Sequence, residues 1–403
     1  MPEAVIVATA RSPIGRAWKG SLVEMRPDEM AAQTVRAALA KVPQLPTSEV
    51  EDLLVGCGQP AGEAGYNIAR VVALLADMPG CPGVTVNRYC SSSLQTIRMA
   101  AHAIRAGEGD VFVAGGVEAV SRFGKGMADG LPDTQHPRFR EATERSAARA
   151  AGGMKPWEPA PGLPDIYIAM GQTAENVREL EGVSRREMDE LAALSQQRAV
   201  ASQDNGFFEQ EIVPLEKPDG TLVSRDDGPR PGTTVEKLAT LPPAFRPDGE
   251  VTAGNACPLN DGAAAVVVMS DTRAAQLQIT PLARIVSSGV SALDPEIMGL
   301  GPVEASRQAL ARAGLTVDDV DLVEINEAFA AQVVPAARHL GVPWDKLNVH
   351  GGAIALGHPF GMTGARIMTT LVNGLQTEDK TIGLETMCVG GGQGMAMVVE
   401  RLA

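Results

Sequence analysis

A cysteine and a histidine in this sequence occupy positions at which side chains are often reactive. Cys90 lies in VTVNRYCSSSLQ (residues 84–95), between a β-branched run and an apolar stretch with helical periodicity. The free N–H groups and positive dipole end of that helix are predicted to lower the thiol pKa from about 8.5, giving a thiolate near neutral pH. His358 lies in GGAIALGHPFGMTG (351–364), just before a second predicted helix. Together they could form a nucleophile and its base, although a buried structural cysteine and an ordinary turn histidine are the alternatives.

Two further segments bring polar groups to strand ends. MCVGGGQG (387–394) follows a predicted strand and carries Cys388, and its consecutive glycine N–H groups are suited to holding an oxyanion. VEINEAFA (323–330) ends another predicted strand with Asn326. The alternatives are glycines that serve close backbone packing and an asparagine that forms an Asx turn.

The elements that position these residues occur twice. Residues 30–56 and 303–326 both predict an Ala-rich amphipathic helix, a short loop and an acidic pair before a strand. Residues 90–118 and 361–392 both predict a small-residue turn, a helix, a polar link and a buried strand ending in glycines. The same order in two halves predicts two similar α/β domains with mostly parallel sheets.

The predicted organisation has four parts. Residues 1–119 form the first part of the N-terminal half and residues 251–280 complete it, while residues 281–403 form the C-terminal half. Between them, residues 120–250 are rich in Arg, Pro and Gly around a helical centre, which predicts an inserted loop domain that covers an active site or an oligomer contact.

Composition limits the possible functions. The chain has 403 residues and a formal net charge of −14, which argues against a nucleic-acid or anionic-membrane partner. No apolar stretch approaches the roughly 18 residues of a membrane span, so we expect a soluble protein without membrane insertion. The five cysteines are scattered and never spaced C-x-x-C, which predicts no disulfide framework, no metal site and a cytoplasmic location.

Seven motifs together resemble the thiolase family, the acetyl-CoA acyltransferases, over nearly the whole chain. They are VNRYCSSSLQ, MGQTAENV, DDGPRPGTT, TAGNACPLNDGAAA, INEAFA, GGAIALGHPFGMTGAR and CVGGGQG. The resemblance implies a five-layered αβαβα fold with duplicated halves and a loop domain. It implies coenzyme A as a co-substrate, with no permanently bound cofactor, and a homo-oligomer, either a dimer or a tetramer, with AGYNIARVVALLADMPG at a possible contact.

The resemblance also implies roles for five residues. Cys90 would take the acyl group, and His358 would draw the thiol proton and help hold the thioester oxygen. Cys388 would act as acid and base at the α-carbon. Asn326 would position a water for a first oxyanion hole with His358, and the N–H groups of Cys90 and Gly390 would form a second. Cleaving between the α and β carbons needs a nucleophile and a separate proton donor, which explains two cysteines.

The resemblance to the thiolase family also implies that seven residues contact coenzyme A. Arg230 is the expected cation for its phosphates, and the others would line the pantetheine channel: Met170, Phe245, Ala253, Cys257, Ala328 and Phe329. Two positions depart from the family pattern. Ser93 replaces a glycine after the nucleophile and could alter its turn, and Cys257 replaces a serine and donates a weaker hydrogen bond.

The expected activity is thiolytic cleavage of a 3-ketoacyl-CoA to acyl-CoA and acetyl-CoA. Ala169 and the VNR-x-CSS opening favour this degradative branch over a biosynthetic, acetoacetyl-CoA-forming acetyltransferase. A decarboxylating 3-ketoacyl synthase shares the nucleophile but has no use for Cys388. The departures at Ser93 and Cys257 suggest another alternative, a weakly active CoA- or lipid-binding protein. A cysteine protease is a remote alternative. No function is assigned to the remaining histidines: His102, His136, His339 and His350.

Overall fold

The computed structural model describes residues 2–129, 131–153 and 155–403; Met1, Gly130 and Met154 lie outside the described residues. Ten strands form one large sheet. They are β1 (Ala4–Arg11), β2 (Gly15–Arg16), β3 (Asp52–Gly56), β4 (Gly83–Val86), β5 (Val111–Ala119), β8 (Asn260–Ser270), β9 (Ala283–Ala292), β10 (Leu322–Ile325), β11 (Ile382–Val389) and β12 (Gln393–Arg401). A separate hairpin pairs β6 (Leu215–Glu216) with β7 (Leu222–Val223).

The large sheet consists of two parts, one from each half of the chain. The strand order is β10-β11-β12-β9-β1-β8-β5-β3-β4, with β2 paired to β8. The two parts join between β1 and β9 through two residue pairs, Val5 with Arg284 and Ile6 with Ala283. Both parts contain parallel and antiparallel pairs, so the expectation of mostly parallel sheets holds for β3, β4 and β5 and for β10 and β11, but not for the strands near the join.

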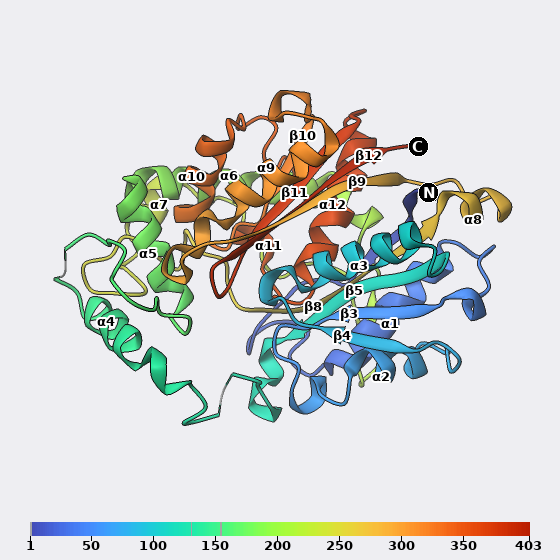
Figure 1. The fold of residues 1–403 in the computed structure, drawn as a ribbon, viewed down its shortest axis with the longest axis horizontal. Coiled ribbons are helices and arrows are strands. Elements are labelled where there is room, and N and C mark those ends of the chain that lie inside the picture. The colour runs from blue at the N-terminus through green and yellow to red at the C-terminus, as the bar shows by residue number, and fades with distance from the viewer. Residues whose placement is uncertain (1, 130, 154) are drawn as a thin grey trace.

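Helices complete a five-layered αβαβα arrangement (Figure 1). The helices that cover the sheet are α1 (Pro27–Ala40), α2 (Ile68–Leu75), α3 (Ser92–Ala106), α9 (Gly301–Ala313), α10 (Ala330–Leu340) and α12 (Thr363–Thr377). The α1–α2 pair covers the outer face of the N-terminal sheet, α9 and α10 cover that of the C-terminal sheet, and α3 and α12 pack between the sheets. Side chains alternate along each strand: Val5 and Val7 contact the outer layer, whereas Ile6 contacts the central one.

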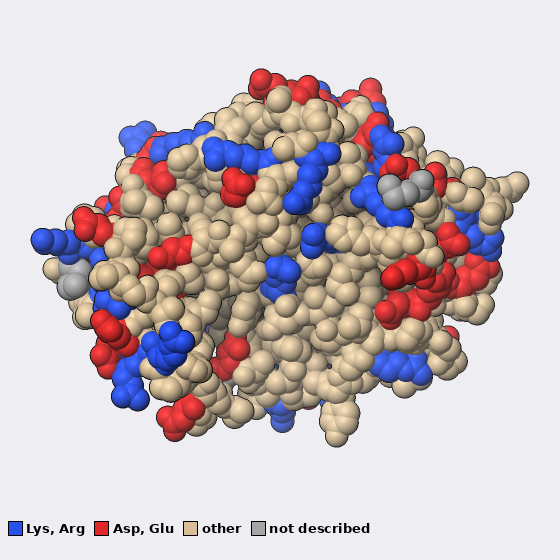
Figure 2. Space-filling view, in the orientation of Figure 1, with Lys and Arg blue, Asp and Glu red and all other residues tan. Residues whose placement is uncertain are grey.

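The stretch between β5 and β8 has a different character. It carries α4 (Arg140–Ala150), α5 (Met170–Glu181), α6 (Arg185–Asp204) and the short α7 (Val235–Ala239), which lie at the left of Figure 1. Short helices α8 (Asp271–Gln276) and α11 (Ala353–Leu356) complete the set. No helix among the described residues is long and apolar enough to cross a membrane. On the face in Figure 2, basic and acidic side chains are interspersed around a centre that carries few charges.

Candidate active site

The starts of the two central helices touch each other. The Ser93 hydroxyl accepts a hydrogen bond of 2.9 Å from the N–H of Ala365, in the first turn of α12. A Cβ added to Gly364 would lie 2.4 Å from the backbone nitrogen of Leu94, so the helices approach as closely as glycine allows. The two reactive residues that precede these helices are thereby brought to one place. Ser93, which replaces the family's glycine, has its side chain buried and bonded to the facing helix.

The ends of two parallel strands supply the other groups. β10 and β11 pair in register up to Ile325 and Thr386, and the Asn326 N–H continues the ladder by donating to Thr386 O at 3.0 Å. Asn326 therefore follows β10 at the edge where β11 carries Cys388. Parallel strands present their carboxyl ends at the same edge, which brings these two side chains to the side of the site that faces the helix starts.

His358 is held in one tautomer. Its Nδ1 lies 2.6 Å from the Thr363 hydroxyl, and that hydroxyl donates its only proton to Pro359 O at 2.8 Å. The hydroxyl must therefore accept from Nδ1–H, which leaves Nε2 unprotonated. The Asn326 Nδ2 amide lies 3.3 Å from Nε2 as its donor. Burial, together with the charge of Arg366, lowers the pKa of His358 to about 3, so the ring is a neutral base.

The prediction of a thiolate at Cys90 is wrong for the resting protein. Burial raises the pKa of this thiol to about 11, although the N–H groups of Gly390 and of Cys90 itself favour the charged form in part. Helix dipoles act within the first turn, and here desolvation outweighs them. The same two N–H groups are the predicted second oxyanion hole, and both lie close enough to the sulfur to interact with it.

Three thiols share this site. Burial raises the pKa of Cys388 far above its ordinary value, and the charges of Cys90 and Cys257 would raise it further. Burial likewise raises the pKa of Cys257, again with Cys90 as a neighbour. The two expected catalytic cysteines are therefore close enough to influence each other's charge.

A cavity of about 650 Å³ opens beside Cys90. Its apolar wall includes Ile166, Ile168, Met170 and Phe360, and Gly390 lies beside them. Cys90 is 8% exposed whereas Cys388 is fully buried, so the cavity reaches the first sulfur directly. Of the expected channel residues, Met170 is the one that lines this cavity.

The other expected CoA contacts lie at a second, narrower cavity or behind it. Arg230 and Ala253 line this narrow cavity of about 70 Å³. Phe245 is 37% exposed and meets the Phe329 ring edge-on at 5.7 Å. Ala328 is buried, and its carbonyl accepts from the Cys257 N–H at 3.0 Å.

Sequence reasoning missed Glu118, at the end of β5. Its buried carboxylate accepts hydrogen bonds from Gly58 N at 2.8 Å, Gln59 N at 3.2 Å and Gly361 N at 2.9 Å. It thus ties a loop of the N-terminal half to the turn that carries His358. Burial raises its pKa to about 7. A glutamate in a buried strand was the available signal, since such a group needs several donors.

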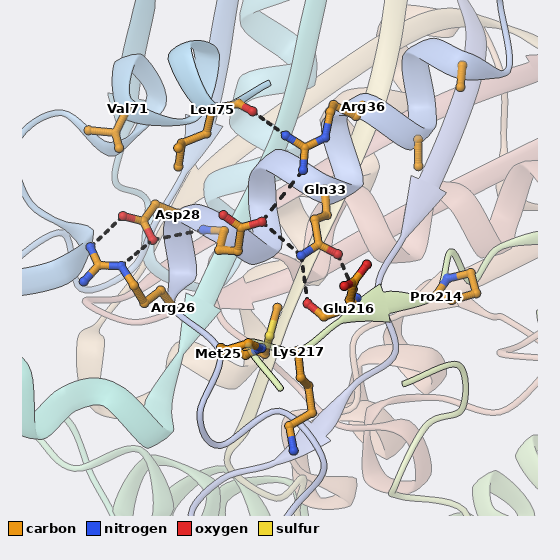
Figure 3. A pocket seen from close by; sticks show the side chains of 14 residues that line it. Met25, Arg26, Asp28, Gln33, Arg36, Val71, Leu75, Pro214, Glu216 and Lys217 are labelled. Atoms are coloured by element: carbon orange, nitrogen blue, oxygen red, sulfur yellow. Dashed lines mark hydrogen bonds and ion pairs between the residues drawn. The ribbon is translucent and has the colours of Figure 1, made fainter. Parts of the chain in front are cut away.

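A large open groove on the surface is unrelated to this site. It is an open groove of about 1020 Å³ between α1, the end of α2 and the β6 segment (Figure 3). Its polar side chains bond to one another: Arg26 to Asp28, Gln33 to Glu29, and Arg36 to Leu75 O. A lining whose charges are already paired offers little to a charged ligand.

One histidine outside the site is accounted for structurally. His350 stacks on Phe207 with ring centroids 3.5 Å apart, and its Nδ1 lies 3.2 Å from the Ser202 hydroxyl. Burial lowers its pKa to about 4.

No group of three metal-ligating side chains occurs among the described residues.

Comparison with known proteins agrees with this arrangement. The thiolase N-terminal domain matches residues 4–272, and the thiolase C-terminal domain matches residues 279–401. The 3-ketoacyl-CoA thiolases of Cronobacter sakazakii and Aeromonas hydrophila are each 44% identical over 411 aligned residues, covering 100% of both chains. The crystal structure of the Bacillus anthracis acetyl-CoA acetyltransferase superposes with a TM-score of 0.85 at 38% identity, covering 100% of this chain and 99% of that one. The chain belongs to the thiolase family.

Proposed function

We propose that this protein is a 3-ketoacyl-CoA thiolase, which cleaves a 3-ketoacyl-CoA with coenzyme A to give a shortened acyl-CoA and acetyl-CoA. The observation that carries the proposal is the set of contacts among residues from four separate segments: Asn326 lies against His358, Cys388 has Cys90 as a neighbour, and Cys90 lines the cavity. Full-length relatives that carry this name support it.

In the first half-reaction, Cys90 attacks the 3-keto carbon while His358 Nε2 takes the thiol proton. The oxyanion forms against the N–H groups of Cys90 and Gly390. The C2–C3 bond then breaks, its electron pair goes to C2, and Cys388 protonates this enolate so that acetyl-CoA leaves. Asn326 Oδ1 is buried without a protein partner among the described residues, which supports its role in positioning a water.

The second half-reaction restores both sulfurs. Coenzyme A enters as a thiol and gives its proton to the Cys388 thiolate. Its sulfur attacks the acyl-enzyme carbonyl, and the Cys90 sulfur leaves and takes back the proton held by His358. The same groups run in reverse for condensation, so the alternative acetoacetyl-CoA-forming activity uses identical residues.

The size of the cavity beside Cys90 favours acyl chains longer than acetoacetyl. About 650 Å³ falls within the roughly 300–1,000 Å³ typical of small-molecule sites. An acetyl group would leave most of that space unfilled, whereas an extended acyl chain could cover its apolar wall.

The test is a thiolysis assay over a chain-length series of 3-ketoacyl-CoA substrates, with Cys90→Ala and Cys388→Ala alongside the wild type. We expect cleavage by the wild type and losses of at least about 10² in kcat for both variants. A wild type that binds coenzyme A but cleaves no member of the series would instead support a CoA-binding protein.

We also propose a homo-oligomer located in the cytoplasm. β4 is a free edge of the sheet, and the neighbouring Tyr66 and Leu74 are 97% and 53% exposed. Exposed apolar side chains beside an open strand edge are typical of a subunit contact. Light scattering of the wild type and of Tyr66→Asp tests the oligomer: a smaller species is expected for the variant.

The proposed cytoplasmic location is supported by the cysteines. All five cysteines are free, which fits a reducing compartment.

A further inference from the structure

Two adjacent aspartates, Asp226 and Asp227, form hydrogen bonds that hold their loop against the start of the chain at the narrow cavity. Asp226 accepts from Arg11 Nη1 at 2.8 Å and from the Ile14 N–H at 2.7 Å. Asp227 accepts from the Arg16 N–H at 2.9 Å. The Arg11–Asp226 pair is fully buried, where breaking a charge pair is costly. The 226–230 segment is therefore held in a fixed position against the start of the chain.

This fastening places two arginines on the same cavity. Arg16 is half-buried, Arg230 is exposed at the rim, and both line the narrow cavity together with Thr233. The like charge of Arg16, after burial, contributes to lowering the pKa of Arg230. The Lys237 Nζ donates to Gly232 O at 2.6 Å, two residues after Arg230 in the chain. A local basic cluster is unusual in a chain with a net charge of −14.

Neither guanidinium is satisfied within the described part of the chain. No carboxylate lies within 4.0 Å of the Arg16 or Arg230 side chain, and neither side chain donates a hydrogen bond there. By contrast, Arg185 and Arg246 in the same region each hold a carboxylate. Two unpaired, mutually repelling guanidiniums at a cavity are suited to binding an anion, above all a phosphate, with bidentate geometry.

The cavity is lined in part by segments that also carry site residues. One wall is Ile354 of α11, the helix that immediately precedes the His358 turn. Another wall includes Ala253 and Pro258, which flank Cys257. The two arginines therefore lie on a cavity whose walls adjoin, in sequence, the segments that carry His358 and Cys257.

We propose that Arg16 binds the phosphates of coenzyme A jointly with Arg230, so that the two arginines form a clamp for the nucleotide end of the substrate. This inference rests on the proposed function, since it takes coenzyme A to be the ligand. Arg16 is thus a second, sequence-distant cation for the site, contributed by β2.

The experiment measures the Kd of coenzyme A and of pantetheine, which has the same thiol arm without phosphate, by calorimetry on the full-length protein. The variants are Arg16→Gln, Arg16→Lys and Arg230→Gln, with Arg225→Gln as the control because Arg225 is exposed in the same loop and lies outside the cavity. We expect Arg16→Gln to weaken coenzyme A binding about tenfold and Arg16→Lys to weaken it less. Pantetheine binding should change in no variant, and Arg225→Gln should match the wild type.

The proposal is overturned if Arg16→Gln binds coenzyme A as tightly as the wild type, or if pantetheine binding weakens by the same factor. Thermal unfolding of each variant shows whether a loss of binding comes from a loss of folded protein. A wild type that binds coenzyme A but fails the thiolysis assay would contradict the proposed function and leave the clamp intact, so the two failures are distinguishable.

Discussion

The protonation state of the nucleophile in the resting enzyme gives a sharp prediction. The pKa of Cys90 is about 11 and that of His358 about 3, a gap of about 8. Moving the proton from sulfur to imidazole before substrate binds would therefore cost about 11 kcal/mol. Even two unit charges only about 4 Å apart would return only about 4 kcal/mol in a partly polar site. The neutral pair should dominate by about 7 kcal/mol, which corresponds to a factor of roughly 10⁵.

Alkylation by iodoacetamide, followed by peptide mass spectrometry, measures this directly. A neutral thiol with a pKa near 11 should react slowly at pH 7, and its rate should rise about tenfold per pH unit up to about pH 10. His358→Gln should show the same dependence, because the histidine does not hold the thiol proton at rest. A rate that is already constant between pH 6 and pH 8 would refute the reasoning, since it would reveal a preformed thiolate.

Three further predictions concern residues that support the site. Thr363→Val removes the acceptor for His358 Nδ1–H, and we expect kcat for thiolysis to fall by about 10-fold or more with KM little changed, whereas Thr363→Ser should retain most activity. Burial raises the pKa of Glu118 from 4.5 to about 7 in the folded protein. Between these two pH values the folded protein therefore still holds a proton that the unfolded chain has already released. Its contribution to the free energy of unfolding therefore falls by up to about 3 kcal/mol as pH rises through that window, and denaturation of Glu118→Gln should lack this component. Gly364→Ala pushes a methyl group against Leu94 N and should cost about 1–3 kcal/mol by chemical denaturation, whereas a neutral result would mean that the helices can separate.

The sequence predicted the elements that carry the reactive residues because each depends on local pattern. The β-branched run before Cys90 forms β4, the apolar periodic stretch after it forms α3, and the glycine-rich turn of His358 leads into α12. Hydrophobic periodicity determines such elements over short distances. The duplicated order of these units was enough to predict two similar α/β halves, whereas the five-layered arrangement was implied by the resemblance to the thiolase family.

Properties that depend on distant contacts could not be predicted in this way. The pKa of Cys90 is set by burial under segments far from it in sequence, so the helix-terminus argument gave the wrong direction. The contact of Ser93 was not predicted because its partner, the N–H of Ala365, lies 272 residues away. Arg16 carried no signal at all, since its relation to Arg230 depends on the fastening by Asp226 and Asp227.

Burial also explains how three neighbouring thiols can coexist in this site. Oxidation and disulfide formation require a thiolate, and burial raises the pKa of Cys90, Cys257 and Cys388 alike. At rest, therefore, each sulfur keeps its proton and is slow to react with an oxidant or with its neighbours. The nucleophile becomes charged only as its proton passes to His358 during attack on a bound carbonyl, whose oxyanion the N–H groups of Cys90 and Gly390 then stabilise. Reactivity in this site is thus coupled to the presence of the acyl substrate.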